Sequence, residues 1–213
     1  MSSRTYSGLF IAEGSSDQPL AEHIQLLFYE RGVELMLSSP EFERLSSKVT
    51  KDVESRIAAG LALNHDPVDL IVVHRDADNA GYQTRLHEII AAYAATSSQA
   101  ALIPVIPVRM TEAWLLLDET AIRQVAGNPR GRVNLGLPKV HEVESISDPK
   151  ARLAECILRA ADETGRRRDG VKARFNEHRR QLLARLEPSG PLSRLESWRR
   201  LTHAVDQVVK GWK

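Results

Sequence analysis

The sequence predicts an α/β fold with a mostly parallel sheet flanked by helices, followed by a C-terminal helical appendage. Apolar strand patterns alternate with helical patterns through about residue 125, which is typical of a parallel α/β domain. The strand candidates are apolar at consecutive positions, as in strands covered on both faces. A chain of 213 residues, 42% hydrophobic and 27% charged, has ordinary globular composition and enough length for a sizeable core.

The expected elements follow in order. We expect strands at residues 6–12, 33–38, 69–78 and 101–110, the last at an irregular or edge position because it contains prolines. Helices are expected at 19–32, at 42–64 in one or two pieces, at 82–96 and at 111–127, where the helix is single or broken near Asp118.

The rest of the chain is expected to be helical after a connector. Residues 128–150 carry five Pro or Gly and predict a loop, and helical patterns follow at about 149–163, 171–186 and 192–212. The expected organisation is therefore an α/β domain over 1–127, a connector over 128–150, and a basic helical region over 151–213 packed on the domain.

Charge is distributed unevenly. Residues 1–150 hold 14 Lys/Arg and 20 Asp/Glu, whereas residues 151–213 hold 15 Lys/Arg and 8 Asp/Glu. This distribution suits a nucleic-acid enzyme whose acidic site binds metal, and it equally suits a solvated basic helix pair beside an acidic domain. The single Cys156, and the lack of a signal peptide or membrane-spanning pattern, favour a cytoplasmic protein without membrane contact.

Acidic residues follow the expected strands. Glu13 ends the first strand, Asp76 and Asp78 end the third, and Glu112 comes two residues after the fourth, while Asp17 lies four residues after Glu13. The carboxyl ends of parallel strands form the ligand crevice of such folds. Two carboxylates about 4 Å apart repel by about 4 kcal/mol at an effective dielectric of 20, so a shared proton or a divalent cation is expected. Oxygen ligands suit Mg²⁺ or Mn²⁺.

These motifs carry a family resemblance. The order "IAEGSSD", "IVVHRDAD", "EAWLLLD" (Glu112–Asp118) and "DPK" (Asp148–Lys150) resembles the TOPRIM domain, and most closely small stand-alone bacterial TOPRIM-like proteins related to the OLD nucleases. The resemblance covers residues 8 to about 160. It implies that residues 1–127 form a TOPRIM-like domain, with one metal on Glu13, Asp76 and Asp78 and a second on Asp17 and Glu112.

The resemblance also implies an activity. Two such metals would activate a water and stabilise the leaving oxygen of a phosphodiester, and Lys150, or else Lys139, is the expected cation beside the transition state. We therefore expect a Mg²⁺- or Mn²⁺-dependent nuclease acting on nucleic acid, DNA in preference to RNA, through the Arg-rich C-terminal region. The OLD relationship implies a role in phage defence or DNA repair, beside a partner ATPase.

Plainer interpretations stay open for the same residues. Asp17 is also a candidate helix N-cap, Glu112 suits the positive end of a helix, and Gly14 would permit a tight turn. His74 is expected to be packed, with Arg75 facing the opposite way and lining the crevice.

Two other functions also stay open. The first is a non-catalytic TOPRIM-like module that binds a partner ATPase or a nucleic-acid end, and the second is a phosphatase or nucleotide hydrolase. "HRDADN" lacks the remaining kinase motifs, and the chain has no P-loop motif.

Overall fold

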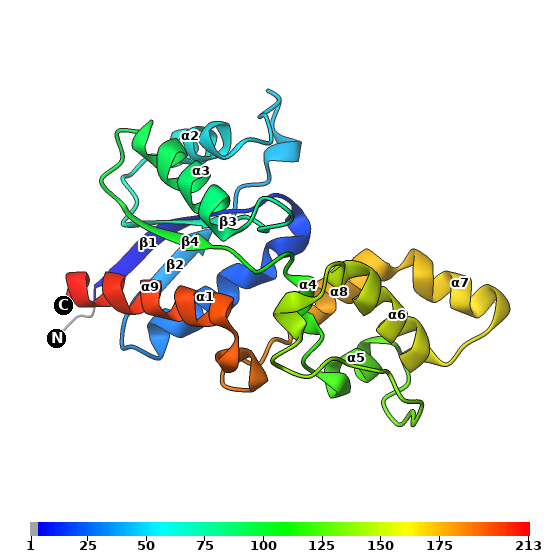
Figure 1. Cartoon of the computed structure of the whole chain (residues 1–213). Helices are drawn as coiled ribbons and strands as arrows, with labels where there is room; N and C mark the ends of the chain where they lie inside the picture. Colours follow the sequence, from blue (N-terminus) through cyan, green and yellow to red (C-terminus); the bar gives the residue numbers. More distant parts are fainter. Residues whose placement is uncertain (1–3) are drawn as a thin grey trace. The chain divides into compact units, whose positions relative to one another are not determined.

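The structure is a computed structural model that describes residues 4–213 (Figure 1). The chain forms two compact units. The first runs to Ile106 and includes Arg199–Lys213, and the second is Pro107–Trp198. The division thus falls at residue 106 rather than at 127, and the end of the last helix groups with the sheet.

The first unit contains the sheet. Its strands are β1 (Thr5–Ile11), β2 (Glu34–Ser38), β3 (Leu70–His74) and β4 (Ala101–Val105), all parallel and in the order β2-β1-β3-β4. The predicted α/β class with a parallel sheet is confirmed, and so is the edge position of the proline-containing strand. Pro104 has no N–H to donate, which an edge strand tolerates.

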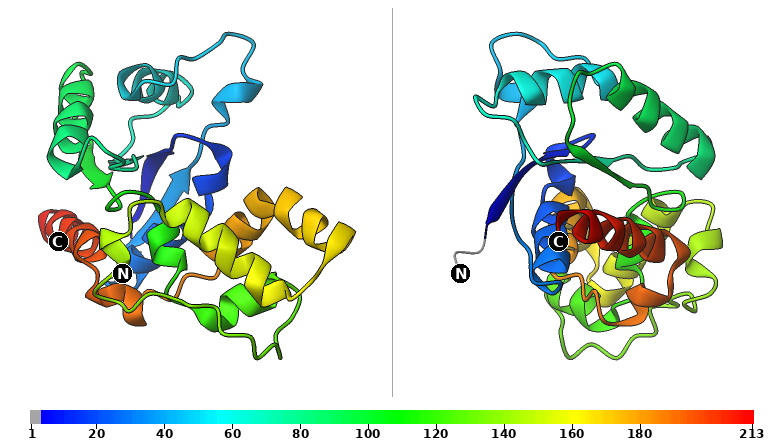
Figure 2. Two further views of the ribbon diagram at one scale, coloured as in Figure 1. Left: turned by 45° about the vertical axis from the view of Figure 1, so that its right-hand side comes forward. Right: turned by 90° about the vertical axis from the view of Figure 1, so that its left-hand side faces the viewer.

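Helices cover both faces of this sheet (Figures 1 and 2). α2 (Val53–Ala62) and α3 (Tyr82–Ala94) lie on one face, and α1 (Pro19–Tyr29) and the later part of α9 (Glu196–Trp212) lie on the other. Leu9, Ile11, Ile71 and Val73 are buried in one cluster with residues of α2 and α3. Because side chains alternate along a strand, Phe10 and Val72 face the other way, and both are also buried. This two-sided burial explains why β3 and the second half of β1 lack a polar face.

Short 3₁₀ turns complete the first unit. η1 (Ser15–Asp17) precedes α1, and η2 (Phe42–Arg44) precedes α2, so the expected helical stretch at 42–64 is divided into two pieces. Gly14 has φ −155°, an extended conformation open to any residue, and a Cβ added to it would come no closer than 3.9 Å to an atom beyond its chain neighbours. The conformational freedom of glycine, expected to permit a tight turn, is therefore not used at this position.

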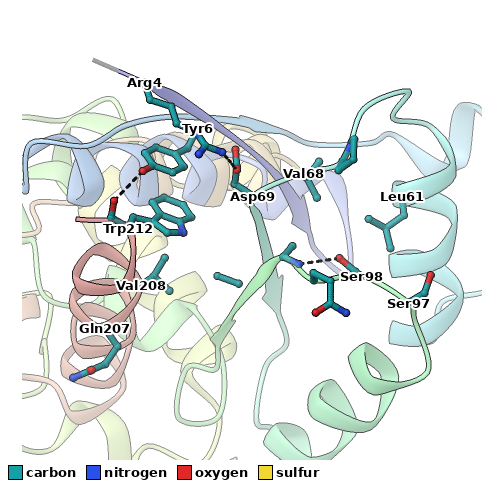
Figure 3. A pocket seen from close by; sticks show the side chains of 15 residues that line it. Arg4, Tyr6, Leu61, Val68, Asp69, Ser97, Ser98, Gln207, Val208 and Trp212 are labelled. Atoms are coloured by element: carbon teal, nitrogen blue, oxygen red, sulfur yellow. Dashed lines mark hydrogen bonds and ion pairs between the residues drawn. The ribbon is translucent and has the colours of Figure 1, made fainter. Parts of the chain in front are cut away.

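The amino ends of the strands border a cavity of about 920 Å³ (Figure 3). Tyr6 of β1 stacks on Trp212 of α9 with ring centroids 3.9 Å apart and nearly parallel planes. Its hydroxyl donates to the Trp212 carbonyl at 3.2 Å, and the Arg4 guanidinium lies over the Tyr6 ring while pairing with Asp69 at 2.6 Å. These contacts anchor the end of the chain to the first strand.

The second unit is helical. It contains α4 (Glu112–Leu115), α5 (Glu119–Val125), η3 (Val143–Ser145), α6 (Pro149–Ala161), α7 (Gly165–Ala173), α8 (Phe175–Leu183) and η4 (Pro191–Arg194). The break near Asp118 is confirmed, because this residue caps α5 by accepting from the Ala121 N–H at 2.9 Å. Trp114 and Trp198 pack edge to face at 5.2 Å, and the Trp114 indole N–H donates to the Ser197 hydroxyl at 2.8 Å.

Membrane insertion was not expected from the sequence. Within residues 4–213, no helix combines the length and the apolar character needed to cross a bilayer.

Candidate functional site

The predicted acidic edge lies where β1 and β3 end. The register pairs Ile11 of β1 with Val73 of β3, so the residues two positions further on, Glu13 and Arg75, emerge beside each other. The Arg75 Nη1 atom is 2.6 Å from Glu13 Oε1. Arg75, which was expected to line the crevice, is the direct partner of the first predicted metal ligand.

A second arginine extends the network along α3. Arg75 Nη2 is 3.1 Å from Glu88 Oε1, and Arg85 Nη1 is 2.8 Å from Glu88 Oε2. Arg85 Nη2 lies 3.6 Å from Asp78 Oδ2. The hydrogen bond to Glu88 raises the pKa of Arg85, burial opposes this rise, and the charges of Glu88, Asp78 and Glu13 add to it. Two guanidinium groups thus hold three carboxylates.

His74 ends β3 and lies between two of the predicted ligands. It is 1% exposed, with Nδ1 3.9 Å from Asp17 Oδ2 and Nε2 3.6 Å from Asp76 Oδ1. Both distances exceed those of a direct hydrogen bond. The packed position expected for His74 is confirmed, and the structure adds that this ring separates Asp17 from Asp76.

Asp17 and Asp78 differ from expectation in their local conformation. Asp17 lies in the 3₁₀ turn before α1, and the N-cap of α1 is Gln18 without a side-chain cap hydrogen bond, so the prediction that Asp17 caps this helix is wrong. Asp78 has φ +48°, a left-handed conformation outside β3. The strand alternation that would have aimed Asp76 and Asp78 in one direction therefore does not apply.

Glu112 belongs to the second unit. It begins α4 as a buried residue, and Arg179 of α8 donates from Nε to its Oε1 at 2.7 Å. The other oxygen, Oε2, is buried without a hydrogen bond. The structure therefore gives Glu112 a buried arginine partner. Arg179 belongs to the Arg-rich C-terminal region expected to contact nucleic acid, but it is only 5% exposed.

The two lysines proposed beside the transition state are also in the second unit. Lys150 is exposed in the first turn of α6, and Lys139 is exposed in the segment before η3. In the first unit, Arg75 and Arg85 instead form ion pairs with acidic residues of this edge. The position of Arg75 beside Glu13 could have been predicted from the pairing of two parallel strands. The positions of Arg85 and Glu88 could not, because the sequence pattern does not specify how their helix is rotated relative to the sheet.

The donors at the acidic edge fit a divalent cation only in part. Glu13, Asp76 and Asp78 supply the hard oxygen ligands that Mg²⁺ and Mn²⁺ prefer, on the edge where β1 and β3 end. Over residues 4–213, however, no three His, Cys, Asp or Glu side chains come close enough together to hold a metal ion. The donors therefore fit in chemical type but not in spacing, and a cation could take Glu13 and Asp78 only if these side chains moved together and gave up their arginine partners.

Comparisons of the chain with protein-family models, with curated proteins and with solved structures found no match.

Proposed function

We propose that this chain is a Mg²⁺- or Mn²⁺-dependent hydrolase of phosphodiester bonds in nucleic acid, with a TOPRIM-like domain of the OLD type. The observation that supports it best is the position of Glu13, Asp76 and Asp78. They follow β1 and β3, the two strands from which the chain turns to opposite sides of the sheet. Ligands of open α/β sheets bind at this switch point, outside the carboxyl ends of the strands.

Glu13, Asp76 and Asp78 would hold the cation, with Asp17 beyond the His74 ring. When bound, the cation would supply Lewis acidity and a water of lowered pKa. The side chains of the protein then have separate roles. Arg75 and Arg85 present planar guanidinium groups suited to the oxygens of a phosphate, and the buried His74 ring keeps Asp17 and Asp76 apart.

The same geometry explains how a dense acidic edge is stable without metal. Glu13 is 38% exposed and Arg75 16% exposed, so their attraction is partly screened by solvent. Loading with a cation would release the guanidinium of Arg75 toward the substrate. Arginine thus replaces Lys150 as the proposed phosphate-binding cation at this edge.

Cleavage of nucleic acid tests the proposal. Purified protein is incubated with plasmid DNA, with labelled single-stranded DNA and with RNA in Mn²⁺ or Mg²⁺. The variant Asp76→Asn with Asp78→Asn should abolish metal-dependent cleavage. Asp66→Asn, an exposed acid in the turn before β3, is the matched control and should retain it. Cleavage that persists in the double variant would contradict the assignment.

A non-catalytic binding module is the second candidate. It is favoured by the ion pairs that engage Glu13, Asp78 and Glu88, because a structural network needs no metal. Its partner would be a nucleic-acid end or an ATPase, and the OLD resemblance suggests phage defence or DNA repair in the cytoplasm. Titration calorimetry and thermal unfolding with Mn²⁺ separate the two candidates. A binding module should neither bind Mn²⁺ at millimolar concentrations nor unfold at a higher temperature when Mn²⁺ is added.

A further inference from the structure

A groove in the second unit lies between α6 and the place where α7 ends and α8 begins. It has a volume of about 370 Å³ and a floor of aliphatic and aromatic side chains: Ala151, Ala154, Leu158, Val171 and Phe175. Phe175 is half-buried. The volume is at the lower end of the range for small-ligand sites.

The walls of the groove are positively charged. Lys150 of α6 and Lys172 of α7 line it, and both are exposed. Asp148 also lines the groove, but its Oδ1 accepts the Ala151 N–H at 2.8 Å as the N-cap of α6. Residues 165–185, which contain α7 and α8, carry eight Lys/Arg and two Asp/Glu. The groove therefore combines an apolar floor with cationic walls.

We infer that this groove binds one unpaired base of a single-stranded nucleic acid, with Phe175 as the stacking platform and Lys150 and Lys172 contacting the flanking phosphates. The apolar face of a base matches the apolar floor of the groove. The phosphates on either side of its nucleotide match the lysines of the walls. A base within a duplex is stacked and paired, so it cannot enter such a groove without being unstacked. This inference rests on the proposed function for its choice of nucleic acid over another anionic polymer.

The consequence is a preference for single strands, or for duplex ends and gaps, over intact duplex. Stacking on an aromatic ring is tolerant of sequence, so we expect little base specificity. The aliphatic residues of the floor make the other plausible occupant an acidic amphipathic peptide, and the experiment includes it.

Fluorescence anisotropy in EDTA measures binding without cleavage. The probes are a labelled oligothymidylate, the same strand with abasic sites, a duplex of equal length, and a peptide of alternating Glu and Leu. The native chain should bind the oligothymidylate at least tenfold more tightly than the abasic strand. Phe175→Ala and Phe175→Leu should each weaken binding of the base-containing strand roughly tenfold, as removal of a stacking ring typically does. Phe175→Tyr, which keeps an aromatic ring, should bind the base-containing strand as tightly as the native chain does. None of the three Phe175 variants should change the affinity for the abasic strand.

The lysines are tested through salt dependence. Lys150→Gln with Lys172→Gln should lower the slope of log affinity against log salt by about 1.4, because each phosphate contact on a single strand contributes about 0.7. Lys48→Gln with Lys210→Gln removes two exposed charges from the first unit and should leave the slope within about 0.3 of the native value. Thermal unfolding of every variant shows whether a loss of binding reflects a loss of folding.

Several outcomes would overturn the inference: equal affinity for abasic and base-containing strands, tighter binding of duplex, or binding of the acidic peptide alone. Its failure is distinguishable from failure of the proposed function. Mn²⁺-dependent hydrolysis of bis(p-nitrophenyl) phosphate requires Asp76 and Asp78 but no base site, so it should survive Phe175→Leu. Base-dependent binding in EDTA by a chain that hydrolyses neither ester nor strand would support the groove and contradict the hydrolase.

Discussion

Removal of the Arg179 guanidinium is predicted to destabilise the second unit strongly. The Arg179 and Glu112 side chains are 7% and 5% exposed, and their Nε and Oε1 atoms are 2.7 Å apart. At that distance the attraction is about 6 kcal/mol for an effective dielectric of 20, and it is offset by the desolvation of both charges. Arg179→Met leaves the buried carboxyl group of Glu112 without its arginine partner. We expect a loss of about 3–5 kcal/mol in unfolding free energy.

Urea unfolding followed by tryptophan fluorescence measures this loss. Trp114 lies two residues from Glu112 and packs against Trp198 within the same unit, so its emission should report the transition. The double variant Glu112→Leu with Arg179→Met should recover most of the stability, because it replaces both charges by apolar groups. A loss below about 1 kcal/mol for Arg179→Met, or no recovery in the double variant, would refute the buried-pair explanation.

Three further predictions concern single positions. Arg75→Ala should tighten Mn²⁺ binding in calorimetry, because the variant frees Glu13 for the metal. The same variant should cleave nucleic acid more slowly, because it lacks a phosphate-binding group. Weaker Mn²⁺ binding would contradict the idea that the cation replaces Arg75 as the partner of Glu13. Burial, aided by the charge of Arg174, lowers the pKa of His178 below its usual 6.5. The stability that neutral His178 contributes is therefore complete above about pH 6.5 and is lost as pH falls toward the pKa in the folded state. Thermal unfolding between pH 5 and pH 8 should show a smaller fall in unfolding temperature at acidic pH for His178→Gln than for the native chain. Gly8→Ala should cost about 1–3 kcal/mol, since its Cβ would lie 2.9 Å from the Leu70 carbonyl oxygen, whereas Gly14→Ala should change stability by less than about 0.5 kcal/mol in chemical denaturation.

Local patterns in the sequence determined the elements and the composition of the acidic edge. The β-branched run of β3 predicts a two-sided buried strand because its apolar residues are consecutive, and the structure buries all five residues. Asp118 predicts a helix start because a short acidic side chain can accept a nearby backbone N–H, and it does so. Glu13, Asp76 and Asp78 are expected at one edge because parallel strands end on the same side of a sheet, and β1 and β3 are neighbours. These features depend on residues within a few positions of each other, or on one rule of topology.

Only the tertiary structure decided how the charged groups are paired. Arg75 contacts Glu13 because β1 and β3 are aligned so that paired residues are 62 positions apart in the sequence. Glu88 contacts Arg75 because of the rotation of α3 relative to the sheet. Arg179 was one of several arginines in a basic stretch, and its burial beside Glu112 depends on the packing of α8 near α4. Pairing between distant residues is set by registers and helix rotations that no short segment encodes. The sequence therefore predicted that Glu13, Asp76 and Asp78 follow strands of one sheet, and the fold decided which side chains pair with them.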